Sequence, residues 1–124
     1  MAAVGYRDGM RSAEEIKQFV EEQMSLISNP DVRGRIREGL VDPYPVHRDW
    51  DYGLPDQKLA CWTVFEHKPS NTSIAFCEEG FGPKNPWGLV YLSGQYMSIG
   101  MDSSWYITLE QAFRESMAWS AAGH

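Results

Sequence analysis

The sequence predicts an α+β domain with an antiparallel sheet, and two patterns in its 124 residues support this class. Apolar residues recur at helical spacing near both ends of the chain, whereas the middle holds short apolar runs separated by Gly and Pro. Consecutive strands joined by short loops favour an antiparallel meander, and helices at both ends can cover one face of it. We therefore expect the order α-α-β-β-β-β-α, with a four-stranded sheet.

Two helices are expected before the first strand. Ser12 and Glu15 form a capping box, in which the Ser side chain accepts from the N3 amide and the Glu side chain reaches back. Asn29 is the expected cap of the second helix, because Pro30 suits the first helical position, and this helix should end near Gly39.

The last helix is expected to begin at Thr108, with Gln111 completing a second capping box. Helical spacing predicts one buried stripe on it, formed by Leu109, Ala112, Phe113, Ser116 and Met117. The chain is expected to form a single domain over residues 1–124, with flexible ends at residues 1–11 and 120–124.

The first two strands are expected over residues 59–66 and 73–77, joined by a turn at residues 68–71. Both runs are rich in β-branched, aromatic or other apolar side chains, which suit a pleated surface. A loop over residues 78–86 follows, because its content of Gly and Pro is too high for a strand.

A hairpin supplies the other two strands, with a tight turn at residues 94–95 that places Gly where φ must be positive. This register pairs Val90 with Ile99 and Gly88 with Met101, which gives one apolar face. The other face carries Trp87, Leu89, Tyr91 and Tyr96 opposite Ser98, Gly100 and Asp102. Either a helix or the N-terminal arm covers these rings, as is usual for large aromatics, or they form an exposed binding surface.

Residues 41–57 are expected to form a long loop, because they hold three prolines and a glycine. Loops longer than about 12 residues inside a compact domain are often functional. Asp49, Trp50 and Asp51 place a ring between two acids, which suits a protein contact because the ring gives area and the acids select a charged partner. The alternative is that Trp50 and Tyr52 anchor the loop to the domain.

The formal net charge of −6 argues against nucleic acid as a partner, because phosphates bind Lys and Arg. The charge is compatible with a basic protein partner, although acidity also serves solubility. No apolar run approaches the roughly 18 residues of a transmembrane helix, and residues 1–10 lack a basic region followed by an apolar one, so no secretion signal is expected. We therefore expect a cytoplasmic protein that does not bind membranes.

The sequence contains no motif for a cofactor or a metal ion, since its histidines and cysteines lack ligand spacing. Cys61 and Cys77 are expected to be buried free thiols, on strands whose pairing could place them opposite one another. No nucleophile elbow or similar motif is present, so no catalytic residue is assigned. The alternative function is a small-molecule-binding protein or hydrolase-like enzyme that uses Glu78 or Asp102 with a histidine in a pocket.

The contact surface expected for a protein partner combines the acidic run around Trp50, the loop over residues 78–86 and the aromatic face of the hairpin. Its residues are Asp49, Trp50, Asp51, Glu78, Glu79, Phe81, Trp87, Tyr91, Tyr96 and Asp102. A small acidic α+β chain of this character resembles the bacterial immunity proteins that neutralise a cognate toxin. The resemblance implies a non-enzymatic inhibitor that occludes its toxin. Self-association of the aromatic surface into a homodimer is a further alternative.

Overall fold

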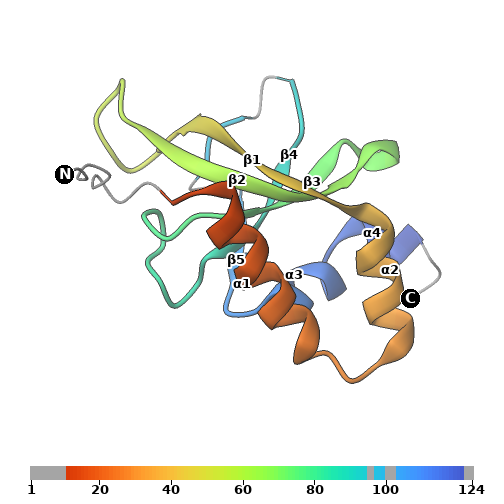
Figure 1. The fold of residues 1–124 in the computed structure, drawn as a ribbon. Helices are drawn as coiled ribbons and strands as arrows, with labels where there is room; N and C mark the ends of the chain where they lie inside the picture. The colour runs from red at the N-terminus through yellow and green to blue at the C-terminus, as the bar shows by residue number, and fades with distance from the viewer. Residues whose placement is uncertain (1–10, 95–96, 100–102, 122–124) are drawn as a thin grey trace.

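The computed structural model of the protein describes residues 11–94, 97–99 and 103–121. Within these ranges a five-stranded antiparallel sheet runs in sequence order from β1 to β5, and four α-helices accompany it (Figure 1). The predicted α+β class with an antiparallel sheet is confirmed, but the expected number of strands is wrong. The elements are α1 Ala13–Ser25, α2 Pro30–Gly39, β1 Leu40–Asp49, β2 Lys58–His67, a 3-10 helix at Lys68–Ser70, β3 Thr72–Phe76, β4 Trp87–Tyr91, β5 Ser104–Tyr106, α3 Leu109–Arg114 and α4 Met117–Ala121.

The expected loop over residues 41–57 is wrong for its first half, which forms strand β1. Two prolines lie in this strand, and each occupies a place where the ladder needs no N–H donor. Pro43 lies in the register shift between Leu40 and Tyr44, where the pairing with β2 is interrupted. Pro45 lies in the regular part of an edge strand, where proline is tolerated if its nitrogen faces away from the neighbouring strand.

The hydrogen bonds at the end of β1 show which way each backbone group faces. Trp50 N donates to Gln57 O on the β2 side, whereas Asp49 O accepts from Ile99 N on the outer side. Backbone groups alternate sides along a strand, so Pro45 faces outward like Asp49. The missing N–H of Pro45 therefore costs no hydrogen bond with β2.

The predicted hairpin between residues 89–92 and 97–101 is also wrong. Strand β4 pairs instead with β5, so that Gly88 lies opposite Trp105. Ile99 pairs with Trp50 in an isolated parallel bridge, and not with Val90. The physical reason is that the outer edge of β1 offers Ile99 two backbone hydrogen bonds.

Residues 97–99, between β4 and β5, lie on the face of the sheet opposite the helices (Figure 1). Gly94 has a φ of +107°, as predicted for a turn at this position. Residues 97–99, called the crossing segment below, then reach the edge of β1. The side chain of Ile99 packs in a small buried cluster that also contains Leu59, Cys61, Ala75, Cys77 and Val90. Residues 95–96 and 100–102, which include Tyr96, Gly100, Met101 and Asp102, lie outside the described part of the chain.

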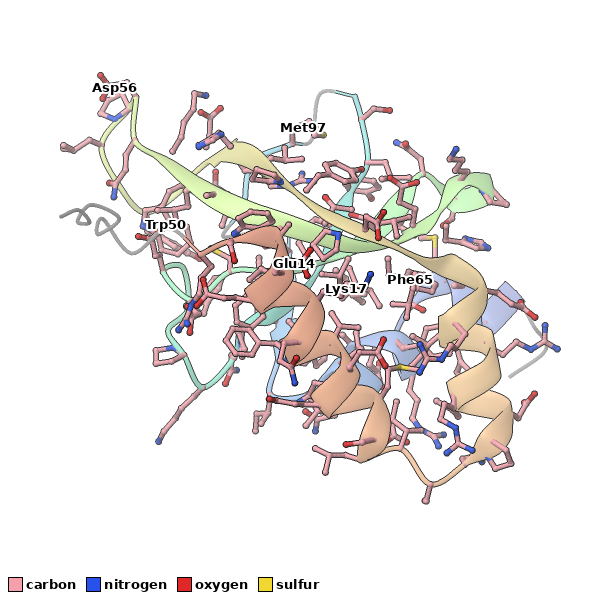
Figure 2. The ribbon with its side chains drawn as sticks, viewed as in Figure 1. Glu14, Lys17, Trp50, Asp56, Phe65 and Met97 are labelled. Atoms are coloured by element: carbon pink, nitrogen blue, oxygen red, sulfur yellow. The ribbon has the colours of Figure 1, made fainter. Side chains whose placement is uncertain are left out.

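The other face of the sheet packs against the helices and forms the larger core. Phe65 points from β2 into this layer (Figure 2), and its ring centroid lies 5.6 Å from that of Phe113. The buried members of this core include Ile16, Val20, Met24, Val32, Ile36, Trp62, Val64, Ile74, Phe76, Trp87 and Leu109. Burying such side chains contributes about 1.5–3 kcal/mol each, so most of the stability of the fold arises on this face.

The caps predicted for the first two helices are confirmed. Ser12 Oγ accepts from Glu15 N, and Glu15 Oε1 accepts from Ser12 N, which completes the capping box of α1. Asn29 Oδ1 accepts from the first amides of α2, and Pro30 occupies the first helical position. Local sequence chemistry therefore determines where both helices begin.

The last helix differs from its prediction at two points. Thr108 caps α3 as expected, but the Gln111 side chain accepts from Ile107 N and not from Thr108 N. The helix then breaks before Met117, whose side chain is 55% exposed, so its place in the predicted buried stripe is wrong. Ser116 accounts for the break, because its hydroxyl donates to the Phe113 carbonyl and accepts from Trp119 N. These bonds interrupt one helix and begin the next.

The β4–β5 pairing predicts opposite effects of alanine at two glycines. A Cβ at Gly88 would lie 2.6 Å from the Trp105 ring, so Gly88→Ala should lower the free energy of unfolding by about 1–3 kcal/mol. Gly34 lies in α2 with no atom within 4 Å of such a Cβ, so Gly34→Ala should raise it by about 0.5–1 kcal/mol. Urea denaturation followed by tryptophan fluorescence measures both changes. Equal effects would contradict the pairing of Gly88 with Trp105.

Candidate functional site

Four aromatic rings meet at one end of the sheet, where the β1–β2 and β3–β4 connections lie. Alternate connections of a meander emerge at the same end, so the topology itself brings these two loops together. Trp50 contacts Tyr52 and Phe81 edge to face, with ring centroids 5.2 Å and 5.3 Å apart. Phe81 also lies 6.0 Å from the ring of Trp105. We call Trp50, Tyr52, Phe81 and Trp105 the aromatic patch.

The rings of the aromatic patch are unequally exposed to solvent. Tyr52 is 60% exposed and Phe81 is 40% exposed, whereas Trp50 and Trp105 are half-buried beneath them. Leu54, in the same loop as Tyr52, is also exposed. The half-buried tryptophans therefore support an outer layer of apolar atoms that face water.

The backbone holds this patch in one arrangement. Gly53 N donates to Trp50 O, and Leu54 N donates to the side-chain oxygen of Gln57, so the β1–β2 loop is closed by its own hydrogen bonds. Gly53 packs closely against Trp50, since a Cβ added at Gly53 would lie 2.6 Å from the Trp50 ring. The exposed rings are thus positioned without any partner.

Acidic side chains from β1 and the two loops accompany the patch, and Asp49 and Glu78 form ion pairs. Asp49 accepts from Lys58, and Glu78 forms a two-oxygen pair with Arg11 at 3.0 Å and 3.1 Å. The hydrogen bond to Glu78 raises the pKa of Arg11 above its ordinary value. The remaining acids of the two loops are exposed, and they are Asp51, Asp56 and Glu79. Figure 2 places Asp56 at the tip of the loop that begins at Trp50.

The structure brings together only part of the predicted contact surface. Trp50 and Phe81 are in contact, as expected for the two loops. Trp87 is 2% exposed on the helix face, packed against Phe76 with centroids 4.8 Å apart, so its assignment to an exposed surface is wrong. Tyr91 is 39% exposed but lies at the opposite end of β4, away from the patch. Tyr96 and Asp102 lie outside the described residues.

Two members of the patch are missing from the predicted contact surface. The sequence predicts Tyr52 only as an anchor of the loop, although its spacing of two residues from Trp50 is a signal that the two rings belong together. Trp105 has a subtler signal, because its ring needs a small residue opposite it and Gly88 supplies one. The pairing of Gly88 with Trp105 cannot be predicted if residues 97–101 are assigned as the partner strand of β4.

The groups considered for catalysis are separated. Glu78 and His67 lie at opposite ends of the β2–β3 hairpin, and Glu78 is held by Arg11. His67 Nδ1 lies 2.7 Å from Ser70 Oγ, which is in turn 2.6 Å from Thr72 Oγ1. His67 also lines a cavity of about 300 Å³ whose charged lining residues include Arg35, Glu38, Glu66 and Lys68.

Comparisons with known proteins supply no assignment for this site. The chain matches no protein-family model, no curated protein and no solved structure. In the described ranges no three His, Cys, Asp or Glu side chains are placed to hold a metal ion. No helix among the described residues is long and apolar enough to cross a bilayer. The geometry of the patch therefore carries the functional argument.

The unequal burial of the rings predicts unequal effects on stability. Trp87→Ala removes a buried ring and should lower the free energy of unfolding by about 3–5 kcal/mol. Tyr52→Ala removes a ring that is mostly in water and should change it by less than about 1 kcal/mol. Chemical denaturation of both variants measures the difference. A large loss for Tyr52→Ala would show that the ring serves the fold and is not a free surface.

Proposed function

We propose that this chain is a non-enzymatic protein-binding module whose contact surface is the aromatic patch with its surrounding acids. One observation carries the proposal: Tyr52 and Phe81 present exposed rings side by side, with centroids 6.2 Å apart, on top of two half-buried tryptophans. Apolar patches rimmed by polar groups mark interaction sites on soluble proteins. Tyr and Trp are also enriched among the residues that dominate binding energy.

The fixed arrangement of the patch supports this function. A binding surface that must be ordered on contact loses about 0.5–1.5 kcal/mol for each immobilised side chain. Here, hydrogen bonds within the β1–β2 loop and the close packing of Gly53 against Trp50 already hold the backbone that carries the rings of Trp50 and Tyr52. The partner would therefore gain most of the burial energy of the exposed rings.

The charge around the patch favours a basic partner surface. Asp51, Asp56 and Glu79 are exposed in the two loops that carry the rings, and the whole chain has a net charge of −6. Opposite charges at the rim of an interface steer encounter and exclude partners of like charge. A toxin whose own target is anionic would present such a basic surface.

The finer proposal is therefore an immunity-type inhibitor. Its small acidic domain would cover the basic active surface of a cognate bacterial toxin, and the toxin would be blocked by occlusion without any chemical step. This proposal rests on the resemblance in overall character and on the acidic rim of the patch.

The patch should be required for capture of a basic partner. We expect affinity capture from the organism that encodes the chain to yield one basic protein, and calorimetry to give its affinity. The double variant Tyr52→Ser/Phe81→Ser should weaken that affinity by about 30-fold or more, because it removes two central rings. Leu26→Ser is the matched control, since Leu26 is an exposed apolar residue at the end of α1, away from the patch.

The acidic residues should contribute to the rate of partner association, separately from the contribution of the rings to affinity. Asp51→Asn/Glu79→Gln should slow association and reduce its salt dependence, whereas Glu14→Gln/Glu22→Gln makes the same charge change on α1 and should do neither. Equal binding by the ring variant and wild type would overturn the proposal. A concentration-dependent dimer in sedimentation, lost only in the ring variant, would assign the patch to self-association instead.

A second candidate function is favoured by the contact between His67 and Ser70. A histidine nitrogen 2.7 Å from a serine hydroxyl is the geometry of a base and its nucleophile, and the cavity beside His67 has room for a small molecule. This candidate is a hydrolase-like enzyme with Ser70 as nucleophile. The competing explanation is local, because Ser70 Oγ also donates to the His67 carbonyl and closes the turn.

A fluorophosphonate probe separates these two explanations. A nucleophilic serine should be labelled by the probe, and the label should map to Ser70 and disappear in His67→Ala. Unlabelled wild-type protein, with a serine hydrolase labelled in parallel as a positive control, would remove the hydrolase candidate. That result would leave the protein-binding proposal unaffected.

A further inference from the structure

The two cysteines lie directly opposite each other on neighbouring strands. Trp62 pairs with Phe76 in the β2–β3 ladder, so the next positions along it are Cys61 and Cys77. Cys77 N donates to Pro86 O on the β4 side, which means that its backbone does not bond to β2. Cys61 and Cys77 therefore occupy a non-hydrogen-bonded position of the antiparallel pair. At such positions the Cα atoms lie about 4.5 Å apart, within the range of disulfides.

Both side chains point to the sheet face that the crossing segment covers, and both thiols are free and buried. The Cys61 thiol is placed to donate to the Cys77 sulfur, or to the Leu59 carbonyl oxygen 3.8 Å away. The hydrogen bond from Cys61, together with the backbone N–H groups of Glu79 and Gly80, lowers the pKa of Cys77. Cys77 is therefore the member of the pair that is favoured as a thiolate.

A buried guanidinium adds positive charge on the same face. Arg48 is 1% exposed, and its Nη1 donates to Met97 O in the crossing segment at 3.3 Å. Its Nε has no hydrogen-bond partner among the described atoms. Burial lowers the pKa of Arg48, while interaction with Cys61 opposes that change. This cation lowers the pKa of Cys61, against the larger raising effects of the hydrogen bond to Cys77 and of burial, and so favours the Cys61 thiolate that the second step of a disulfide exchange needs.

We propose that Cys61 and Cys77 form a redox-active dithiol that closes into a cross-strand disulfide. The proposal rests on the register of β2 and β3 and on the groups that face the sulfurs. It is independent of the protein-binding function proposed above.

A small-molecule disulfide of the glutathione type is the oxidant that the reaction needs. The Cys77 thiolate attacks one sulfur of that disulfide, forms a mixed disulfide and releases one thiolate. Cys61 then loses its proton and attacks the Cys77 sulfur, which forms the cross-strand bond and releases the second thiolate. Two protein thiols are oxidised and one external disulfide is reduced to two thiols. Cys77 attacks first because it is the member of the pair favoured as a thiolate, and since it is 2% exposed, the external disulfide reaches it only when the loop after β3 moves away.

The test uses folded wild-type protein equilibrated in buffers of varied ratio of oxidised to reduced glutathione. The samples are quenched with a thiol-blocking maleimide in denaturant and weighed intact, and the disulfide is located by peptide mapping without reductant. We expect one transition from two blocked thiols to a species with a Cys61–Cys77 bond and no maleimide. Far-UV circular dichroism should be unchanged across it.

Single variants test the order of attack. Cys61→Ala should accumulate a mixed disulfide with glutathione at Cys77, whereas Cys77→Ala should react far more slowly at Cys61. Two free thiols at every buffer ratio in the folded wild type would overturn the proposal. A disulfide that forms only in denaturant would overturn it as well, because the native register would then have no part in it. Both of these outcomes are read from the wild type, so they do not depend on the folding of a variant.

Discussion

Ile99 is attached to the outer edge of β1 by two backbone hydrogen bonds, and much of the structure depends on that attachment. Ile99 N donates to Asp49 O, and Ile99 O accepts from Asp51 N. These bonds hold the crossing segment over a sheet face that would otherwise be open to water. They also fix the backbone on both sides of Trp50, the ring on which the exposed part of the aromatic patch rests.

The two faces of the sheet are covered unequally. The helix face provides most of the stability, whereas the opposite face holds the two cysteines. The helix face is thick and almost wholly apolar. The face under the crossing segment is thin, and it contains the buried polar groups Arg48 Nε, Thr63 Oγ1 and Ser73 Oγ, none of which has a partner among the described atoms. Burying such groups opposes folding. The apolar burial in the larger core must therefore offset the unfavourable free energy of burying these polar groups.

Local chemistry in the sequence predicted the capping residues Ser12, Asn29 and Thr108 and the β2–β3 turn. It failed where a residue's role depends on distant neighbours. Pro45 excludes a strand only if its nitrogen faces a partner, and nothing local shows that it faces outward. Ile99 has the right spacing for a hairpin with Val90, yet the edge of β1, far away in sequence, binds it instead. Trp87 was ambiguous between a covered and an exposed face until the positions of the helices were known.

The prolines of β1 also bear on what this protein does at high concentration. A bare sheet edge is a template on which another copy can add its own strand, and repeated addition leads to fibrils. Along the outer side of β1, Pro45 offers a carbonyl but no donor, and Ile99 occupies the groups of Asp49 and Asp51. An incoming strand would find an interrupted ladder, so this side of the molecule resists amyloid-like growth even though the strand is long.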